Sequence, residues 1–179
     1  MGSEQSSQAD WVRDALEHYE GPLIRYAARI TGDAERARDV VQDTFMKLCA
    51  ADRAQVNAHL APWLYRVCRN RALDVRKKEQ RMHLMDNETM AREADSAPTP
   101  RAVAALNETE NTILHAVNGL KAEQQEVFRL KFQDQLSYQE ISDVTGFPVN
   151  NVRYLIHTSL KALRQTLHSQ IECADGIGA

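Results

Sequence analysis

The fold is decided by the stretch between Glu123 and Leu167, whose centre reads Ser137-Tyr138-Gln139-Glu140-Ile141-Ser142-Asp143-Val144-Thr145-Gly146-Phe147-Pro148-Val149-Asn150-Asn151. Ser137 and Glu140 stand three residues apart, the spacing of a capping box that starts a helix. Apolar residues recur at helical spacing before the turn that contains Gly146 and again after it. Two helices joined by a few residues that include a glycine are typical of a DNA-binding helix-turn-helix.

The helix predicted after this turn is basic. Its apolar positions recur every three or four residues from Val152 to Leu167. It also carries Arg153, His157, Lys161 and Arg164, and no acidic residue precedes Glu172. This local charge is the clearest functional indication in the sequence.

The bulk composition is that of a soluble globular protein. The 179 residues, 43% hydrophobic and 26% charged, suffice for one ordinary core or two small ones. A net charge of -3 does not by itself suggest a nucleic-acid binder, so only local charge can decide this. No apolar run approaches the roughly 18 residues of a membrane span, and residues 2–10 lack the apolar core of a signal peptide. We therefore expect a cytoplasmic protein without membrane insertion.

Neither a metal site nor a catalytic constellation is indicated. Cys49, Cys68 and Cys173 are widely spaced and form no zinc or redox motif, so reduced structural thiols are expected. The glycines are scattered and form no phosphate-binding loop. The histidines never stand at metal-ligand spacing with a carboxylate or cysteine. The sequence predicts no metal, no cofactor and no enzymatic activity.

The remaining pattern predicts an all-α protein, because alternation at period two is nearly absent. Trp11–Ile30 reads as two helices that meet at Gly21-Pro22, since proline suits the first turn of a new helix. Thr31-Gly32-Asp33 reads as a stop followed by a new start.

The helix predicted for Ala34–Ala50 has two distinct faces. The polar face is either solvated or a docking surface, and Asp39 and Asp43 could simply pair with Arg38 or Lys47 at helical spacing. The apolar stripe, expected to be core, comprises Ala37, Val40, Val41, Thr44, Phe45 and Leu48.

Residues 52–62 read as an irregular connection, and a strongly basic helix follows over Trp63–Arg81. Its excess of cations indicates attraction to phosphate backbones, although a merely solvated helix would look the same. Trp63 and Tyr65 could stack on unpaired bases or lie in the core. The positive residues, set against Asp74 and Glu79, are Arg66, Arg69, Arg71, Arg76, Lys77, Lys78 and Arg81.

We predict two small helical domains, at residues 9–85 and 109–170, joined by an acidic, proline-bearing linker at 86–108. In the second domain a helix starts over residues 120–123 and runs to about Phe132. After His168 no period remains, and residues 171–179 are expected to form a frayed tail.

At this point the chain resembles a bacterial sigma factor of the extracytoplasmic-function group. Residues 39–48 resemble the family's segment that docks on the clamp helices of RNA polymerase. Residues 62–74 resemble its helix for melting and reading the minus-ten element, and residues 136–164 resemble its region 4, which reads the minus-thirty-five element. The resemblance spans residues 11–167, with the three signatures in the family's order.

The resemblance implies roles in the first domain, which corresponds to sigma region 2. Asn70 matches the position that recognises a base extruded from the non-template strand, and an amide offers both donor and acceptor to a base edge. The loop at residues 52–61 would help to form the base pocket. Polymerase contacts would be Asp39, Gln42, Asp43 and Lys47, and further minus-ten contacts would be Trp63, Arg66, Arg69, Arg76 and Lys77.

In the second domain the resemblance implies duplex contacts from Asn150, Asn151, Arg153, Tyr154, His157 and Lys161. Many members have Gly-Thr in place of Asn150-Asn151, and arginines in place of Leu155 and Thr158. Fewer cations predict weaker affinity for the DNA backbone in this half. Asn150 could alternatively be only the N-cap of its helix.

The implied function is transcription initiation without catalysis by the chain itself. The expected partners are core RNA polymerase, promoter DNA and an anti-sigma regulator. The main alternative is a free-standing helix-turn-helix regulator that binds duplex DNA, and a further one is an interaction protein whose basic helix faces an acidic partner.

Overall fold

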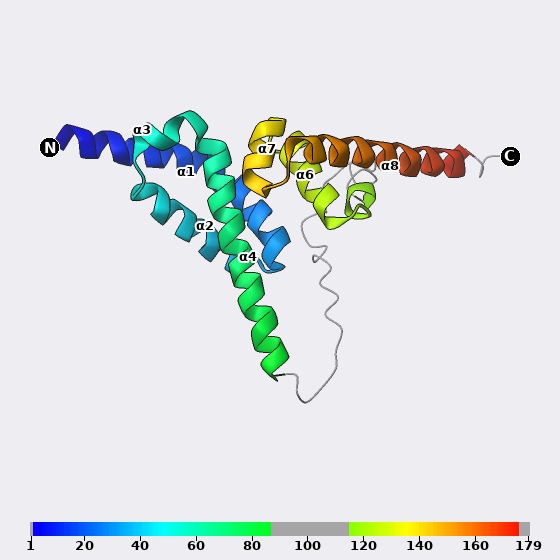
Figure 1. Ribbon diagram of the computed structural model, residues 1–179, viewed down its shortest axis with the longest axis horizontal. Helices are drawn as coiled ribbons and strands as arrows, with labels where there is room; N and C mark the ends of the chain where they lie inside the picture. The colour runs from blue at the N-terminus through cyan, green and yellow to red at the C-terminus, as the bar shows by residue number, and fades with distance from the viewer. Residues whose placement is uncertain (1, 87–114, 176–179) are drawn as a thin grey trace. The chain divides into compact units, whose positions relative to one another are not determined.

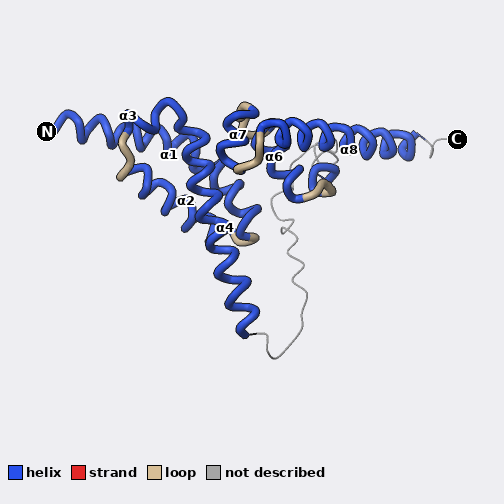
Figure 2. Tube along the Cα trace, in the orientation of Figure 1, coloured by secondary structure: helices blue, strands red, loops and turns tan. Residues whose placement is uncertain are grey.

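The computed structural model describes residues 2–86 and 115–175, with side chains over residues 8–82 and 115–168. Within these ranges the regular structure is entirely helical, as Figure 2 shows, which confirms the predicted all-α class. The chain divides into two compact units, Met1–Pro98 and Thr99–Ala179. Residues 87–108 of the predicted linker lie outside the described residues.

The first unit is built from three long helices and a short helical connection (Figure 1). Helix α1 (Gly2–Thr31) contacts α2 (Ala34–Cys49) and α4 (Leu60–Asp86), and α2 also contacts α4. The predicted apolar stripe of α2 is confirmed, because all of its residues are buried. Side chains without any exposed surface at the centre of this core are Leu23, Ala27, Ala37, Leu48, Leu64, Cys68 and Ala72.

The predicted helix break at Gly21-Pro22 is wrong, because α1 continues through Pro22. Proline inside a helix removes a backbone hydrogen bond and costs roughly 3 kcal/mol or more. Here the buried stripe continues on both sides of the proline, from Trp11 and Ala15 to Leu23 and Ala27. Burial of this stripe against α2 and α4 offsets the local penalty, which sequence propensity alone does not reveal.

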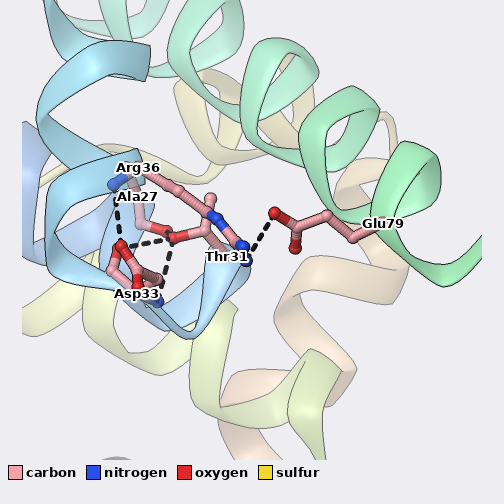
Figure 3. Close-up of polar contacts among 5 residues, drawn as sticks. All are labelled: Ala27, Thr31, Asp33, Arg36 and Glu79. Atoms are coloured by element: carbon pink, nitrogen blue, oxygen red, sulfur yellow. Dashed lines mark hydrogen bonds and ion pairs between the residues drawn. The ribbon is translucent and has the colours of Figure 1, made fainter. Parts of the chain in front are cut away.

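The turn between α1 and α2 is confirmed as a stop and a new start (Figure 3). Gly32 has a φ of +74° and allows the chain to leave α1. The Thr31 hydroxyl lies 3.1 Å from the carbonyl oxygen of Ala27, and the Asp33 carboxylate accepts a 2.8 Å hydrogen bond from the Arg36 amide. Asp33 is thus the N-cap of α2.

Residues 52–62 are more regular than predicted. They contain α3 (Arg53–Val56), the 3₁₀ helix η1 (Asn57–His59) and the beginning of α4 at Leu60. Pro62 lies in the first turn of α4, where its missing N–H has no helical acceptor to lose. Asp52 caps α3 by accepting a 2.9 Å hydrogen bond from the Ala54 amide, and Val56 is buried.

The second unit contains α6 (Ala122–Phe132), α7 (Tyr138–Thr145) and α8 (Val149–Asp175), and α8 contacts both of the others. The helix predicted to start over residues 120–123 and to end near Phe132 is confirmed as α6. The helix-turn-helix is confirmed in its details as well, since Ser137 and Glu140 form the capping box and Gly146 ends α7 with a φ of +78°. Its core residues include Val127, Leu130, Ile141, Val144, Val152 and Ile156.

The predicted frayed tail is partly wrong, because α8 continues to Asp175. No proline or glycine occurs between His168 and Gly176, so nothing in the local sequence stops the helix before that glycine. Absence of an apolar period therefore did not mean absence of a helix.

Burial raises the pKa of the Cys68 thiol from 9.0 to about 12, although a hydrogen bond with Thr44 partly opposes the shift. The Cys68 sulfur also lies 3.9 Å from the carbonyl oxygen of Leu23 in α1. Because the thiolate is the nucleophile, a thiol with this pKa is inert near neutral pH. Cys49 is exposed, so the two thiols stand in opposite environments.

We expect iodoacetamide at pH 8 to modify Cys49 in the folded protein and Cys68 only after unfolding. Peptide mapping by mass spectrometry with and without denaturant checks this. Modification of Cys68 at the rate of Cys49 in the native protein would contradict the buried position.

Replacement of Gly146 by alanine is expected to destabilise the helix-turn-helix by about 1 kcal/mol, because an L residue is strained at this φ. Amide hydrogen exchange in α7 and α8 should then be about fivefold faster. Gly119→Ala is the matched control, since an added Cβ would lie 3.5 Å from the nearest atom, an ordinary contact. Equal acceleration in both variants would show that backbone conformation is not the cause.

Candidate nucleic-acid and protein-docking surfaces

The polar face of α2 is accessible in the first unit. Asp39, Gln42 and Lys47 are exposed, and Asp43 is partly exposed. The opposite face is fully committed to the core, so the helix cannot rotate to hide these groups. The face combines carboxylate, amide and ammonium groups, which suits contacts with a polar protein partner.

Asp43 is paired across the unit and not along its own helix. The Nε atom of Arg71 in α4 donates a 2.7 Å hydrogen bond to the Asp43 carboxylate. Arg38 pairs with Glu35, so the predicted alternative of an Asp43 pair with Arg38 or Lys47 is wrong. Helical spacing shows only neighbours on one helix, whereas this pair joins residues 28 apart in the sequence.

A second ion pair between the same helices joins Arg36 of α2 to Glu79 of α4 (Figure 3). Together the two pairs bridge α2 and α4 outside the apolar core. Both side chains of the Asp43–Arg71 pair are 45% exposed, so solvent screens the attraction and the pair contributes at most about 1 kcal/mol.

Met46 lies among the exposed polar side chains of α2 and was not identified as a candidate from the sequence. Its residue surface is 65% exposed, and it stands three or four residues from Gln42 and Asp43 on the helix. A flexible thioether surrounded by polar groups is characteristic of a protein-docking surface. The sequence signal was available, because Met46 falls outside the apolar stripe of α2.

The face of α4 turned away from the core carries the predicted nucleic-acid residues. Arg66, Asn70, Arg76 and Lys77 are exposed, whereas Arg69 and Trp63 are partly exposed. Trp63, Arg66, Asn70 and Lys77 follow at spacings of three, four and seven residues and therefore share one side of the helix. The opposite side of α4 is buried and includes Leu64, Cys68 and Ala72, which hold the helix in place.

The two aromatic residues at the start of α4 have separate environments. Tyr65 is only 2% exposed, and its ring lies edge-on to Tyr26 of α1 with the ring centroids 5.3 Å apart. Tyr65 is therefore a core residue and the base-stacking alternative is wrong for it. Trp63 keeps part of its surface accessible.

In the second unit, one side of α8 presents all the predicted duplex contacts. Asn150, Asn151, Arg153, Tyr154, His157 and Lys161 are exposed, and Tyr154 reaches 65%. The alternative that Asn150 is only the N-cap of this helix is wrong, because α8 begins at Val149 and both asparagines lie inside its first turn. Proline at position 148 ends the preceding turn just before the helix.

Tyr138 in α7 is a further candidate, which was not identified from the sequence. It is 37% exposed at the first residue of α7. The Nζ atom of Lys131 lies 5.0 Å from the Tyr138 ring centroid, and the guanidinium carbon of Arg153 lies 5.8 Å from it. The Tyr138 ring thus lies close to two cations, Lys131 of α6 and Arg153 of α8.

Leu155 and Thr158, where many family members have arginines, are committed to packing. Leu155 is 8% exposed. The hydroxyl oxygen of Thr158 accepts a 3.0 Å hydrogen bond from the Gln124 amide of α6. Leu155 is therefore part of the buried core and Thr158 links α8 to α6, so neither position presents charge.

Arg129 is the most deeply buried cation described in the second unit. It is 7% exposed and donates a 2.7 Å hydrogen bond from Nη2 to Asn118 Oδ1, while its Nε atom has no partner among the described residues. Burial lowers its pKa, and the charge of Asp134 partly opposes this. Its position makes it a structural residue and not a DNA contact.

Over the described ranges, no group of three or more histidine, cysteine or acidic side chains is arranged to hold a metal ion. Nor does any helix of these ranges have the length and apolarity required to cross a membrane.

Replacement of Arg71 by alanine is expected to lower the free energy of unfolding of the first unit by less than about 1 kcal/mol, because the ion pair is half exposed. Both tryptophans of the chain, Trp11 and Trp63, report on this unit by fluorescence in urea. Leu64→Ala, at a fully buried site, should cost about 2–5 kcal/mol. A cost for Arg71→Ala as large as that for Leu64→Ala would contradict this.

Comparison with known proteins finds matches in both units. Residues 15–82 match the family described as Sigma-70 region 2, and residues 110–163 match Sigma-70, region 4. The chain is 29% identical over 168 residues to the ECF RNA polymerase sigma factor SigW of Bacillus subtilis, covering 88% of this chain and 89% of that protein. It is 28% identical over 166 residues to the ECF RNA polymerase sigma factor SigL of Mycobacterium tuberculosis, covering 90% and 92%.

The fold is also similar to that of a solved structure, the sigma factor RpoE in complex with the anti-sigma factor NepR from Bartonella quintana. The TM-score is 0.64 at 23% sequence identity, over 87% of this chain and 96% of that one. The matched families cover both helical units, so a free-standing helix-turn-helix regulator, which would need only the second, is not favoured. The chain therefore belongs to the extracytoplasmic-function group of the sigma-70 family and is a transcription initiation factor.

Proposed function

We propose that the first unit, within residues 9–85, docks on core RNA polymerase and melts the minus-ten element, while the second unit, within residues 109–170, reads the minus-thirty-five element. The observation that carries this proposal is the construction of α4. Its apolar side packs against α1 and α2, and its opposite side exposes Arg66, Asn70 and Lys77 together. A rigid helix with one amide among cations can hold a separated strand and still recognise a base.

Docking would use the outer face of α2, with Asp39, Gln42, Asp43 and Lys47 as polar contacts and Met46 as an apolar contact among them. Exposed charges at an interface mainly set orientation and association rate, whereas a buried apolar anchor adds affinity.

Melting would depend on Asn70, which can donate to and accept from a base edge. Trapping an unstacked base offsets an unstacking cost of a few kcal/mol. Trp63, Arg66, Arg69, Arg76 and Lys77 would hold the separated strand through stacking and phosphate contacts, which supply affinity more than sequence choice.

Upstream anchoring would use the exposed side of α8, with Arg153 close to the Tyr138 ring and flanked by Asn150, Asn151, Tyr154, His157 and Lys161. Because Leu155 and Thr158 supply no charge, affinity of this unit alone for duplex DNA should be low. Attachment to polymerase raises the local concentration of promoter DNA and so makes the contact effective.

The chain would itself perform no chemistry, since polymerase carries out synthesis, and it would act in the cytoplasm, where polymerase meets the chromosome. An anti-sigma protein that covers the docking surfaces would hold it inactive. A fold similar to that of a sigma factor solved with the anti-sigma factor NepR supports this part of the proposal.

The test is transcription in vitro with purified core polymerase and a promoter library. Asn70→Ala should reduce promoter opening about tenfold or more while polymerase affinity stays unchanged, because the lost group contacts DNA only. Permanganate reactivity of unpaired thymines measures opening. Absence of specific initiation by the unaltered protein would refute the proposed function.

For the outer face of α2 we expect the converse result, in which polymerase binding is the step that is impaired. Asp43→Ala and Met46→Ala should weaken polymerase binding in a pull-down or fluorescence assay. Arg71→Ala is the matched control, because it removes the partner of Asp43 but leaves the carboxylate available. If Arg71→Ala weakened polymerase binding as much as Asp43→Ala, the pair would serve the fold of the first unit and not docking.

A further inference from the structure

The indole of Trp11 in α1 joins the N-terminal part of the chain to the connection between α2 and α4. Trp11 is 6% exposed, and its Nε1 atom donates a 3.1 Å hydrogen bond to Asn57 Oδ1. The guanidinium carbon of Arg53 lies 5.8 Å from the Trp11 ring centroid. One aromatic residue thus contacts both α3 and η1, across 46 positions of sequence in the case of Asn57.

The rest of this connection is also held in place. The Asp52 carboxylate caps α3 and accepts a 3.1 Å hydrogen bond from Gln55, while Val56 is 6% exposed in the core. Gln8 of α1 donates a 3.4 Å hydrogen bond to the carbonyl oxygen of Ala51. Asn57 therefore projects from a backbone that is fixed on either side, which favours a defined side-chain position.

The hydrogen bond with Trp11 determines which way the Asn57 amide faces. An indole N–H can only donate, and an amide nitrogen can only donate, so the amide oxygen must face Trp11. The Nδ2 group is then directed elsewhere, and no described residue accepts a hydrogen bond from it. Because Asn57 is exposed, two oriented N–H donors are presented at the surface of the loop.

We infer that Asn57 is a specificity-determining residue of the base pocket and that Trp11 is its positioning residue. The inference rests on the proposed function, in which Asn70 traps an unstacked base, and on the family resemblance, which assigns the loop at residues 52–61 to the same base pocket. Fixed donors select bases whose distinguishing exocyclic group is an acceptor. Thymine and guanine carry such a carbonyl oxygen, whereas cytosine and adenine carry an amino donor at the corresponding position.

The loop therefore prefers a keto base over an amino base at one position of the minus-ten element. Asn70 on α4 offers both a donor and an acceptor and does not make this distinction by itself. The selectivity comes from the Trp11 hydrogen bond, which removes the freedom of the Asn57 amide to flip.

The test exchanges the donors of Asn57 for acceptors at nearly constant shape. In Asn57→Asp, one carboxylate oxygen keeps the Trp11 bond and the other replaces Nδ2. The ratio of initiation on keto to amino bases, measured across a minus-ten library with core polymerase, should fall about tenfold or invert at a single position. A ratio is unaffected by uniform weakening, so the added charge alone does not change it.

Ala58→Asp is the matched control, since it places a carboxylate at the next exposed position without the Trp11 bond. It should weaken initiation on all promoters alike and leave the ratio unchanged. If Asn57→Asp also leaves the ratio unchanged while the unaltered protein initiates specifically, this inference is overturned and the proposed function stands. If the unaltered protein never initiates, the proposed function fails and the inference fails with it.

The role of Trp11 is tested by a double-mutant cycle. Trp11→Phe keeps an aromatic ring but removes the N–H, so the keto-to-amino ratio should move about threefold or more towards unity. The same substitution made in an Asn57→Ala protein should leave the ratio unchanged. An equal effect of Trp11→Phe in both backgrounds would show that Trp11 supports the fold only and would overturn its positioning role.

Discussion

The burial of one side of α4 is the constraint on which the first unit depends. Leu64, Cys68 and Ala72 lose all contact with water between α1 and α2. An α-helix with a fixed buried stripe has no freedom to rotate, so its opposite side must face solvent. The arginine and lysine side chains on that side therefore form a basic surface whose position in the first unit is fixed. The amide of Asn70 gains its fixed setting from the same packing.

Polar contacts at the helix ends and between helices supplement this apolar packing. The Asp33 cap sets the start of α2, and the Arg36–Glu79 and Asp43–Arg71 pairs connect α2 to α4. Individually these exposed pairs are weak, but they select one register of the two helices. In the second unit the capping box and Gly146 set the geometry of the turn, and α6 supports α8 from behind. Each surface that we assign to a partner is therefore the reverse side of a packed helix.

Local signals in the sequence were sufficient to predict much of the fold. The capping box, Gly146 and the apolar stripe of α2 depend on neighbours within a few residues, and the predictions made from them are confirmed. Predictions failed where distant residues decide the outcome. Pro22 stays inside α1 because of packing against other helices, and Asp43 selects Arg71 over nearer cations. Likewise, the environment of Tyr138 depends on two cations from adjoining elements, and the Trp11–Asn57 contact joins segments that no periodicity relates.

The packing of Leu155 and Thr158 bears on how promoter choice can change through evolution or engineering. Arginine at either position would add a cation for the DNA backbone, but it would remove an apolar contact or the hydrogen bond to Gln124. A single substitution at either position would thus raise the affinity for DNA and lower the stability of the second unit together. Substitutions at Asn150, Asn151 and His157 should cost less stability, because these side chains are already exposed. If α8 reads promoter DNA as we propose, mutational tolerance and promoter selectivity would be confined to the same few positions of this helix, and new specificities should arise there first.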